Sequence, residues 1–326
     1  MKTLLVSLWL LAQALLLPAA HAADPFPSKP ITIIVGVAPG GALDALSRLV
    51  AKGMGTALKQ PVIVENVVGA GGLLGFQRLA KSEPNGHTLM FSNNSMVLIP
   101  LLHPKSGLDV VADTTPIGGV ANVPMVLGVS LKSGIADLPA LLARLRAPGA
   151  QTNLGSGGPG TTAHLAEAML LQLSGGKGEL VQYRGSGPAL NDLMAGTIEV
   201  VLDQTVTMIP LHQGKRVKAI AVSGSSRLAQ MPEVPTFAEG GLPQFDLQIW
   251  NGLVAPKGTP KAVVDVLAAA LASAVESAEF RERIEQLAAQ LPSPTDRSPA
   301  GLGAILQRDQ KRLGELVQQL GLGGER

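Results

Sequence analysis

Apolar and polar positions change their period most clearly between residues 31 and 50. The apolar, β-branched run at 31–35 predicts a buried strand, which a turn at 38–41 ends. Apolar residues then recur at helical spacing from Leu43, with Asp44 in the first turn, where the helix dipole favours an acid. Where a strand is followed by a glycine turn and then a helix, the backbone N–H groups at the start of the helix are unpaired. Such groups predict an anion-binding site.

The same order of strand, glycine-rich turn and helix recurs along the chain, which predicts an α/β fold with parallel, doubly wound sheets. Ligands of such sheets sit beyond the carboxyl ends of the strands. Further strands are expected at 61–66, 87–91, 152–154, 180–183, 198–203 and 217–223, and a polar loop at 92–95. Helices are expected near 73–80, 137–146, 164–173 and 189–195, from 261 to 290 with a break near Ser277, and from about Ser298.

Two long extended runs, 117–130 and 245–255, interrupt this alternation. We interpret them as crossover strands that carry the chain into a second lobe and back. The sequence therefore predicts two Rossmann-like domains joined by two crossovers. Domain I would hold 23–124 and 251–326, and domain II would hold 125–250.

The first residues have the pattern of a signal peptide. Lys2 is followed by the apolar run 4–17 and by the small-x-small sequence at 20–22, so we expect residues 1–22 to be removed after Ala22. No later stretch approaches about 20 uninterrupted apolar residues. The prediction is a soluble exported protein, and the absence of cysteine excludes disulfides and a lipid-bearing cysteine.

Charge and composition narrow the function classes. Removal of Lys2 leaves 25 of the 26 basic residues against 24 acidic ones, and aromatic residues make up only 3% of the chain. This balance gives no basis for a nucleic-acid partner. Since the histidines after the signal do not cluster, we expect no metal site, and no cofactor is predicted. A monomer is expected.

The candidate ligand-binding residues lie in two glycine loops and at two strand ends. A purely structural role stays open for the first loop, in which glycine only supplies the positive φ of a tight turn between strand and helix. Residues 155–160 match a dinucleotide fingerprint, but Pro159 and the short preceding strand disfavour it. The candidates are Ala38, Pro39, Gly40, Gly41, Ser92, Asn93, Ser95, Ser156, Gly157, Gly160, Thr161, Thr162 and Asp203.

A set of short motifs in fixed order resembles one family, the extracytoplasmic solute receptors of tripartite tricarboxylate transporters, or Bug-type binding proteins. The motifs are PSKPI at 27–31, PGGxxD at 39–44, QPVIVEN at 60–66, GAGG at 69–72, PNGHTL at 84–89, GSGxxGTxxHLA at 155–166, YRGSGPAL at 183–190, PEVPT at 232–236, GLP at 241–243 and WNGLVAP at 250–256. The resemblance covers essentially the whole chain after the signal.

The resemblance implies a two-lobed periplasmic binding protein of type II fold that closes on a small carboxylate: a di- or tricarboxylate, an amino acid or an aromatic acid. It implies that the loops 38–41 and 156–162 hold the carboxylate through backbone amides and ordered waters, with 92–95 and Asp203 on the remaining wall. Transporter subunits or a sensor domain would be the partners. Val37 and Ala38 replace an aromatic residue and a proline that relatives often carry, and 67–68 replace Arg-Pro.

Two other functions remain as alternatives at this point. An exported enzyme would use Asp203 and His164 as acid and base, although Asp203 is equally well a helix cap or an acceptor for a ligand amine or hydroxyl. An interaction protein would keep the cleft without any ligand. Trp250 is the one tryptophan after the signal and is expected where the lobes meet.

Overall fold

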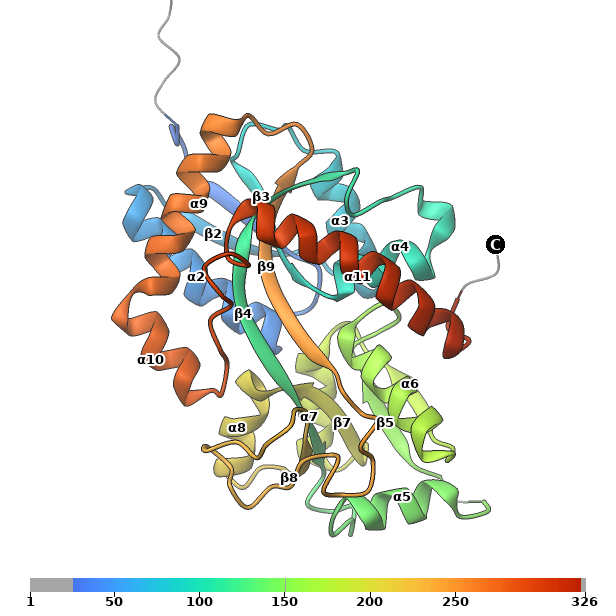
Figure 1. Cartoon of the computed structure of the whole chain (residues 1–326). Coiled ribbons are helices and arrows are strands. Elements are labelled where there is room, and N and C mark those ends of the chain that lie inside the picture. The colour runs from blue at the N-terminus through green and yellow to red at the C-terminus, as the bar shows by residue number, and fades with distance from the viewer. Residues whose placement is uncertain (1–25, 150, 324–326) are drawn as a thin grey trace, which may run out of the picture.

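The fold is described from a computed structural model, which covers residues 26–149 and 151–323. The predicted signal peptide and its cleavage site lie outside the described residues. Two lobes lie one above the other in Figure 1, and two long strands run from one lobe into the other. These strands are β4 (Thr114–Val129) and β9 (Gln248–Pro256).

The first lobe is built on three parallel strands in the order β2-β1-β3, with β9 antiparallel beside β3. Its first five regular elements alternate as the sequence predicts: β1 (Ile31–Val35), α2 (Ala42–Leu58), β2 (Val62–Asn66), α3 (Leu73–Ala80) and β3 (Thr88–Asn93). A 3-10 turn (Ala70–Gly72) precedes α3, and α4 (Ser95–Leu102) with a second 3-10 turn (Pro104–Ser106) follows β3; the sequence pattern did not predict these.

The second lobe repeats this plan. Strand β5 pairs in parallel with both β6 and β7, while β4 lies antiparallel to β7 and to β8. The elements are α5 (Leu138–Arg146), β5 (Asn153–Ser156), α6 (Thr162–Ser174), β6 (Glu179–Gln182), α7 (Ser186–Ala195), β7 (Val200–Gln204), α8 (Thr205–Gln213) and β8 (Lys218–Val222).

The crossover strands confirm the predicted two-lobed architecture. Strand β9 pairs along its whole length with the first part of β4, from Thr114 to Pro124, and the two strands join the sheets of the two lobes into one order, β2-β1-β3-β9-β4-β7-β5-β6. The predicted domain limits at 124/125 and 250/251 fall inside these strands and stay a proposal. Because this pair connects the sheets of the two lobes in the described residues, it is the natural axis for a hinge.

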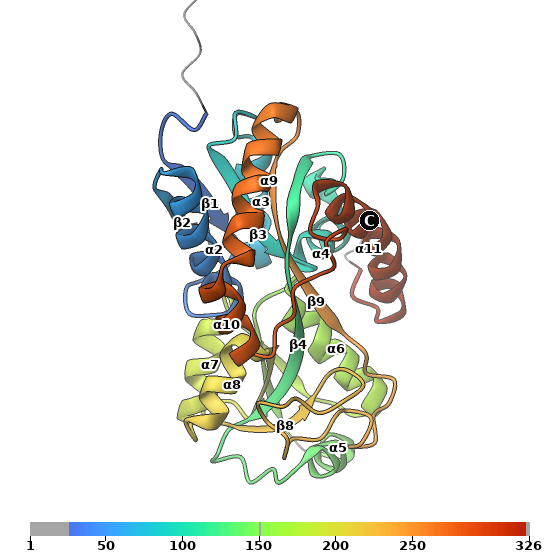
Figure 2. The same cartoon turned by 60° about the vertical axis from the view of Figure 1, so that its left-hand side comes forward.

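After β9 the chain returns to the first lobe and ends in three helices. They are α9 (Lys261–Glu276), α10 (Ala278–Gln286) and α11 (Pro299–Gln319). The break between α9 and α10 lies at Ser277, as predicted, and the Ser277 hydroxyl accepts from the Phe280 N–H. In Figure 2, α9 and α10 lie on the side of α2, while α11 lies on the side of α4. Within the described part of the chain, none of the helices combines the length and apolar character that a membrane crossing needs.

Two expectations need correction. The sheets are mixed rather than purely parallel, because each crossover strand enters its lobe antiparallel to the strands of the repeating units. The loop expected at 92–95 does not exist: Ser92 and Asn93 end β3, and Ser95 begins α4. The apolar run that follows Ser95 forms a short buried helix, and the four polar residues are the seam between strand and helix.

Candidate functional site

The first glycine loop is held in shape by Asp44, a buried residue in the first turn of α2. Its carboxylate accepts from the Gly40 N–H at 3.2 Å, from the Asn66 amide at 3.0 Å and from the Arg48 guanidinium at 2.8 Å. Burial acts to raise the pKa of Asp44, but these hydrogen bonds outweigh it and lower the pKa. Asp44 therefore fixes the turn from within and is not a ligand group.

The second loop is closed on itself by Thr161, the N-cap of α6. Its hydroxyl donates to the Gly158 carbonyl at 2.7 Å and accepts from the His164 N–H at 3.3 Å. Ser156 is buried below this loop and accepts weakly from the Gly158 N–H at 3.4 Å. The cap orients the start of α6 toward the first lobe.

The two lobes are closed on each other at their glycine turns. The Ala38 N–H of the first lobe donates to the Arg184 carbonyl of the second at 2.9 Å. A Cβ on Gly71 would overlap the Pro159 carbonyl oxygen across the gap, so only glycine allows this approach. The sequence predicts that the loops at 38–41 and 156–162 face one cleft. Gly41 of the first loop and Thr161 and Thr162 of the second line the same cavity.

A small cavity of about 30 Å³ remains between the closed lobes. This space suffices for a water molecule, so the closed lobes hold the cavity in a contracted form. Both lobes contribute to its wall. The lining residues are Val37, Gly41, Ala42, Leu43, Asn93, Ser95, Thr161, Thr162, Gly185, Ser186, Asp203 and Gln204.

Four helices begin at this cavity. Their first residues, Ala42 of α2, Ser95 of α4, Thr162 of α6 and Ser186 of α7, all belong to the lining. Two of these helices come from each lobe. Since each helix start carries a partial positive charge and unpaired N–H groups, the cavity is electropositive from both sides without any Lys or Arg in its wall among the described residues.

Asp203, the residue before the last of β7, lies at this cavity and is only 3% exposed. It accepts from the Thr207 hydroxyl at 2.8 Å and from the Ser186 hydroxyl at 3.2 Å. Burial raises the pKa of Asp203 to about 6, although these hydrogen bonds and one from the Gln204 backbone act in the other direction.

A second acid lies behind the first. Glu167 on α6 is fully buried, and neither of its carboxyl oxygens has a well-formed hydrogen bond within the described residues. Burial raises the pKa of Glu167 well above its usual range, which the neighbouring Ser156 hydroxyl and Leu202 backbone only partly offset and the nearby Asp203 increases. Glu167 itself is not part of the cavity lining.

The structure brings some of the sequence-predicted residues to the cavity and leaves others outside it. Ala38 joins the lobes, Pro39 and Gly40 are exposed beside an outer groove, Ser92 and Ser156 are buried nearby, and Gly157 and Gly160 shape the second loop. The candidates that line the cavity are Gly41, Asn93, Ser95, Thr161, Thr162 and Asp203.

Comparison with known proteins connects this geometry to a family. The sequence model of the tripartite tricarboxylate transporter family receptor matches residues 46–322. The chain belongs to this receptor family. The "UPF0065 protein in tcbD-tcbE intergenic region" of Pseudomonas sp. strain P51 is 37% identical over 269 residues, which are 82% of this chain and 80% of the relative.

Solved structures agree with the receptor fold. The periplasmic binding protein BugD superposes with a TM-score of 0.88 at 30% identity, covering 92% of this chain and all of BugD. MatC from Rhodopseudomonas palustris, solved with bound malate, superposes with a TM-score of 0.84 at 32% identity, covering 90% of this chain and all of MatC. The two-lobed periplasmic binding protein fold is thereby confirmed.

Membership in a receptor family argues against the enzyme alternative. The enzyme alternative needs Asp203 and His164 as acid and base in one site. In this receptor Asp203 lines the cavity and His164 does not. Burial lowers the pKa of His164, and its Nδ1 makes no hydrogen bond within the described residues. We interpret His164, in the first turn of α6, as a packing residue.

Sequence reasoning missed six residues of the receptor's cavity. The signal for Gly185 and Ser186 was present, because they stand between β6 and α7 as the first loop stands between β1 and α2. Gln204 follows Asp203 directly at the same strand end. The remaining three, Val37, Ala42 and Leu43, flank the predicted loop on either side.

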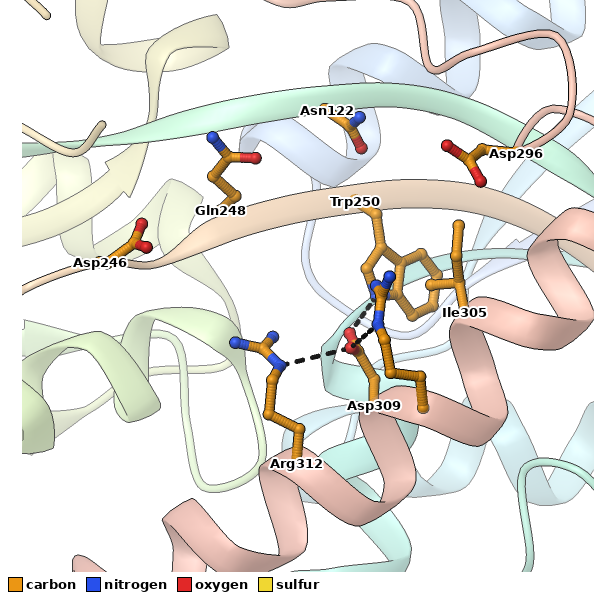
Figure 3. A pocket seen from close by; sticks show the side chains of 9 residues that line it. Asn122, Asp246, Gln248, Trp250, Asp296, Ile305, Asp309 and Arg312 are labelled. Carbon is orange, nitrogen blue, oxygen red and sulfur yellow. Dashed lines mark hydrogen bonds and ion pairs between the residues drawn. The ribbon is translucent and has the colours of Figure 1, made fainter. Parts of the chain in front are cut away.

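A larger cavity of about 460 Å³ lies against the crossover strands, between β9 and α11. Figure 3 shows the carboxylate of Asp309 at its floor, with the indole of Trp250 and the side chain of Arg312 directed toward it. Asp309 is fully buried and accepts from the Trp250 indole N–H at 2.7 Å. The lining residues are Asn122, Asp246, Gln248, Trp250, Asp296, Ile305, Arg308, Asp309 and Arg312.

We call this larger cavity the hinge cavity and the 30 Å³ cavity between the lobes the ligand-side cavity. Asn94 connects the two. Its amide donates to Asp309 at 3.2 Å, and its carbonyl oxygen accepts from the Trp250 backbone N–H at 3.1 Å. The chain neighbours of Asn94 on both sides line the ligand-side cavity. Trp250 therefore faces the hinge cavity, while the next residue, Asn251, donates to Gln204 in the wall of the ligand-side cavity at 3.0 Å.

Proposed function

We propose that this chain is an exported receptor that captures a small organic carboxylate between its lobes and delivers it to a membrane partner. The observation that carries the proposal is the convergence of four helix starts, two from each lobe, on one enclosed cavity. Unpaired backbone N–H groups at helix starts are a general site for oxyanions. A ligand held from both lobes favours the closed state, because it binds that state better than the open one.

The relatives support a carboxylate as the ligand. Membership in the tripartite tricarboxylate transporter receptor family places the chain among receptors of organic acids. MatC, at 32% identity, holds malate. The carboxylate would lie between the starts of α2 and α6, where the predicted residues Gly41, Thr161 and Thr162 meet.

The place of action and the partner form part of the same proposal. A periplasmic location is supported by the family and by the signal-peptide pattern of residues 1–22. The membrane subunits of a tripartite tricarboxylate transporter are the proposed partner, and a sensor domain is the second choice. We propose that the receptor acts as a monomer, because the two lobes of one chain supply all the described residues that line the ligand-side cavity.

Isothermal titration of the purified chain tests the proposal. Succinate, malate, citrate, aspartate, glutamate and nicotinate form the panel, and at least one is expected to bind with a Kd near about 1 μM, equivalent to about −8 kcal/mol. Small-angle scattering with and without that ligand is expected to show a more compact particle. A panel in which no acid binds would contradict the proposal.

A matched pair of variants checks where the acid binds. Leu43→Glu places a negative charge in the cavity wall and is expected to abolish binding. Leu131→Glu makes the same exchange at a side chain that is 59% exposed and distant from the cavity, and it is expected to leave binding unchanged. Equal loss in both variants would contradict this placement of the ligand.

A further inference from the structure

The charge balance of the ligand-side cavity limits the ligand. Asp203 is the one charged side chain among its described lining residues. Each helix start contributes a partial positive charge of about +0.5, which favours an anion. The ionised Asp203 opposes this charge at its own end of the cavity. A ligand with one carboxylate at the helix starts is therefore favoured, whereas a second carboxylate beside Asp203 adds repulsion.

Asp203 also has room for another hydrogen-bond donor. An ionised carboxylate accepts about four hydrogen bonds. The hydroxyls of Thr207 and Ser186 supply one to each oxygen, the Gln204 backbone N–H supplies a third, and the Ser186 bond is long, at 3.2 Å. No Lys, Arg or His lines the cavity within the described residues, so the protein does not supply the cation that a buried carboxylate favours.

The other groups near Asp203 do not supply that donor. Glu167 is buried behind it, and no hydrogen bond joins the two carboxyl groups among the described residues. The side-chain oxygen of Gln204 on the same lining already accepts from Asn251. An ionised carboxylate on a wall without a cation favours an N–H or O–H group of the ligand over a second carboxylate.

We propose that Asp203 determines specificity by accepting from an ammonium or hydroxyl group adjacent to the ligand's carboxylate, so that the receptor selects 2-amino or 2-hydroxy acids over unsubstituted acids. This inference rests on the proposed function and names its substrate class. The carboxylate contacts the helix starts, and the donor on the neighbouring carbon contacts Asp203. An ammonium group also makes the net charge of the ligand less negative, so amino acids bind more tightly than hydroxy acids.

A ligand series on one carbon skeleton tests this proposal with the wild-type chain. Succinate, malate and aspartate differ only in carrying no substituent, a hydroxyl or an ammonium group at the second carbon. A hydrogen bond to a charged group predicts that aspartate binds about 10- to 100-fold more tightly than succinate, with malate between them. Equal Kd values for the three acids would overturn the proposal. Longer pairs, glutamate with glutarate, extend the comparison if the C4 acids are too short.

The variant Asp203→Asn separates the subsite from the rest of the cavity. It is expected to weaken aspartate binding about 100-fold and to leave succinate binding unchanged or stronger, because repulsion is removed. Asp265→Asn makes the same exchange at an exposed position of α9 and is expected to change neither Kd. If Asp203→Asn weakened all three acids equally, Asp203 would be a structural residue and the proposal would fail.

The outcomes distinguish this proposal from the proposed function. If no carboxylate of any kind binds, the proposed function fails. If carboxylates bind without preference for an amino or hydroxyl substituent, the proposed function stands and the role of Asp203 is excluded. Thermal unfolding of each variant shows whether it is folded, and the wild-type series decides the proposal without any variant.

Discussion

Two fully enclosed carboxylates, Asp203 and Asp309, lie on opposite sides of the crossover strands and have very different surroundings. Asp309 accepts from the indole of Trp250 and the amide of Asn94, and the Nε atoms of Arg308 and Arg312 lie 3.3 and 3.4 Å from it. Asp203 accepts only from hydroxyl and backbone groups.

The difference separates structure from binding. A buried carboxylate with all its acceptors used and cations beside it holds elements together, and Asp309 joins α11, β9 and the start of α4 in this way. A buried carboxylate with unused acceptors and no cation is costly to the free protein and is stabilised by an added donor or by protonation. We therefore interpret the hinge cavity as a structural joint and propose the ligand-side cavity as the binding site.

The largest expected effect comes from Asp309→Ala. Truncation leaves the indole N–H of Trp250 and the amide of Asn94 buried without an acceptor. At roughly 2 kcal/mol for each unsatisfied group, the free energy of unfolding is expected to fall by about 4 kcal/mol. Urea unfolding followed by circular dichroism measures it. Arg312→Ala removes a partner whose side chain is 48% exposed and is expected to cost less than about 1 kcal/mol. A loss for Asp309→Ala as small as for Arg312→Ala would remove the contrast.

The pH dependence of stability is expected to expose Asp203. Its pKa is about 6 in the folded chain against an ordinary 3.8, so the folded state binds more protons than the unfolded state between these values. The contribution of Asp203 to the free energy of unfolding of the ligand-free chain therefore falls as the pH rises through this range, by about 2 kcal/mol from pH 4 to pH 6 and by about 3 kcal/mol in all.

Asp203→Asn isolates this contribution. The stability of the variant relative to wild type is expected to rise by about 2.5 kcal/mol between pH 4 and pH 7, measured by urea unfolding at both pH values. Asp44 and Glu167 are present in both chains, so their contributions largely cancel. A difference that does not depend on pH would mean that Asp203 is not destabilised by its burial.

Closure of the lobes can be blocked without touching either carboxylate. Gly71→Ala places a methyl group against the Pro159 carbonyl of the other lobe, so the ligand must bind a more open form. Affinity is expected to fall about 100-fold, since the closed state becomes a minor population. Isothermal titration measures the change.

Gly134→Ala is the matched control for Gly71→Ala. Its φ of +70° is close to the +64° of Gly71, but nothing lies within 4 Å of the added methyl group. Both variants are expected to lose about 1 kcal/mol of stability from the left-handed backbone. Only Gly71→Ala is expected to lose affinity, and an equal loss in both would contradict the closed arrangement of the lobes.

The smallest expected effect is that of Trp250→Phe. This exchange removes one hydrogen bond to Asp309 while keeping most of the packing, so the free energy of unfolding is expected to fall by about 1 kcal/mol. Ligand affinity is expected to stay unchanged, because Trp250 faces the hinge cavity. Circular dichroism is the readout, since the substitution removes the fluorophore. A large loss of affinity would show that the two cavities are coupled through Asn94.

The sequence by itself determined the local features of this protein. Glycine turns after apolar strands, helix starts such as Ala42 and Thr162, and the two extended crossovers all follow from backbone rules that act within a few residues. The ends of β1 and β3, at 38–41 and 92–95, could be expected at one edge, because neighbouring parallel strands end at the same edge of a sheet. The assignment of 38–41 and 156–162 to one cleft rests on the anion-binding character of both glycine loops and on the family resemblance, because these loops belong to different lobes.

Only the tertiary structure decided which of these local features meet. Ser186 and Gln204 join Asp203 at the cavity because β5, β6 and β7 are neighbours in the sheet, and sheet order depends on contacts between residues far apart in sequence. Asp309 carried a visible signal, an acid on the apolar face of α11 between Leu306 and Leu313. Its partners, Asn94 and Trp250, lie 215 and 59 residues away. Local pattern fixes a side chain's element and face, whereas its hydrogen-bond partners, and hence whether it supports the fold or binds a ligand, depend on how the elements pack.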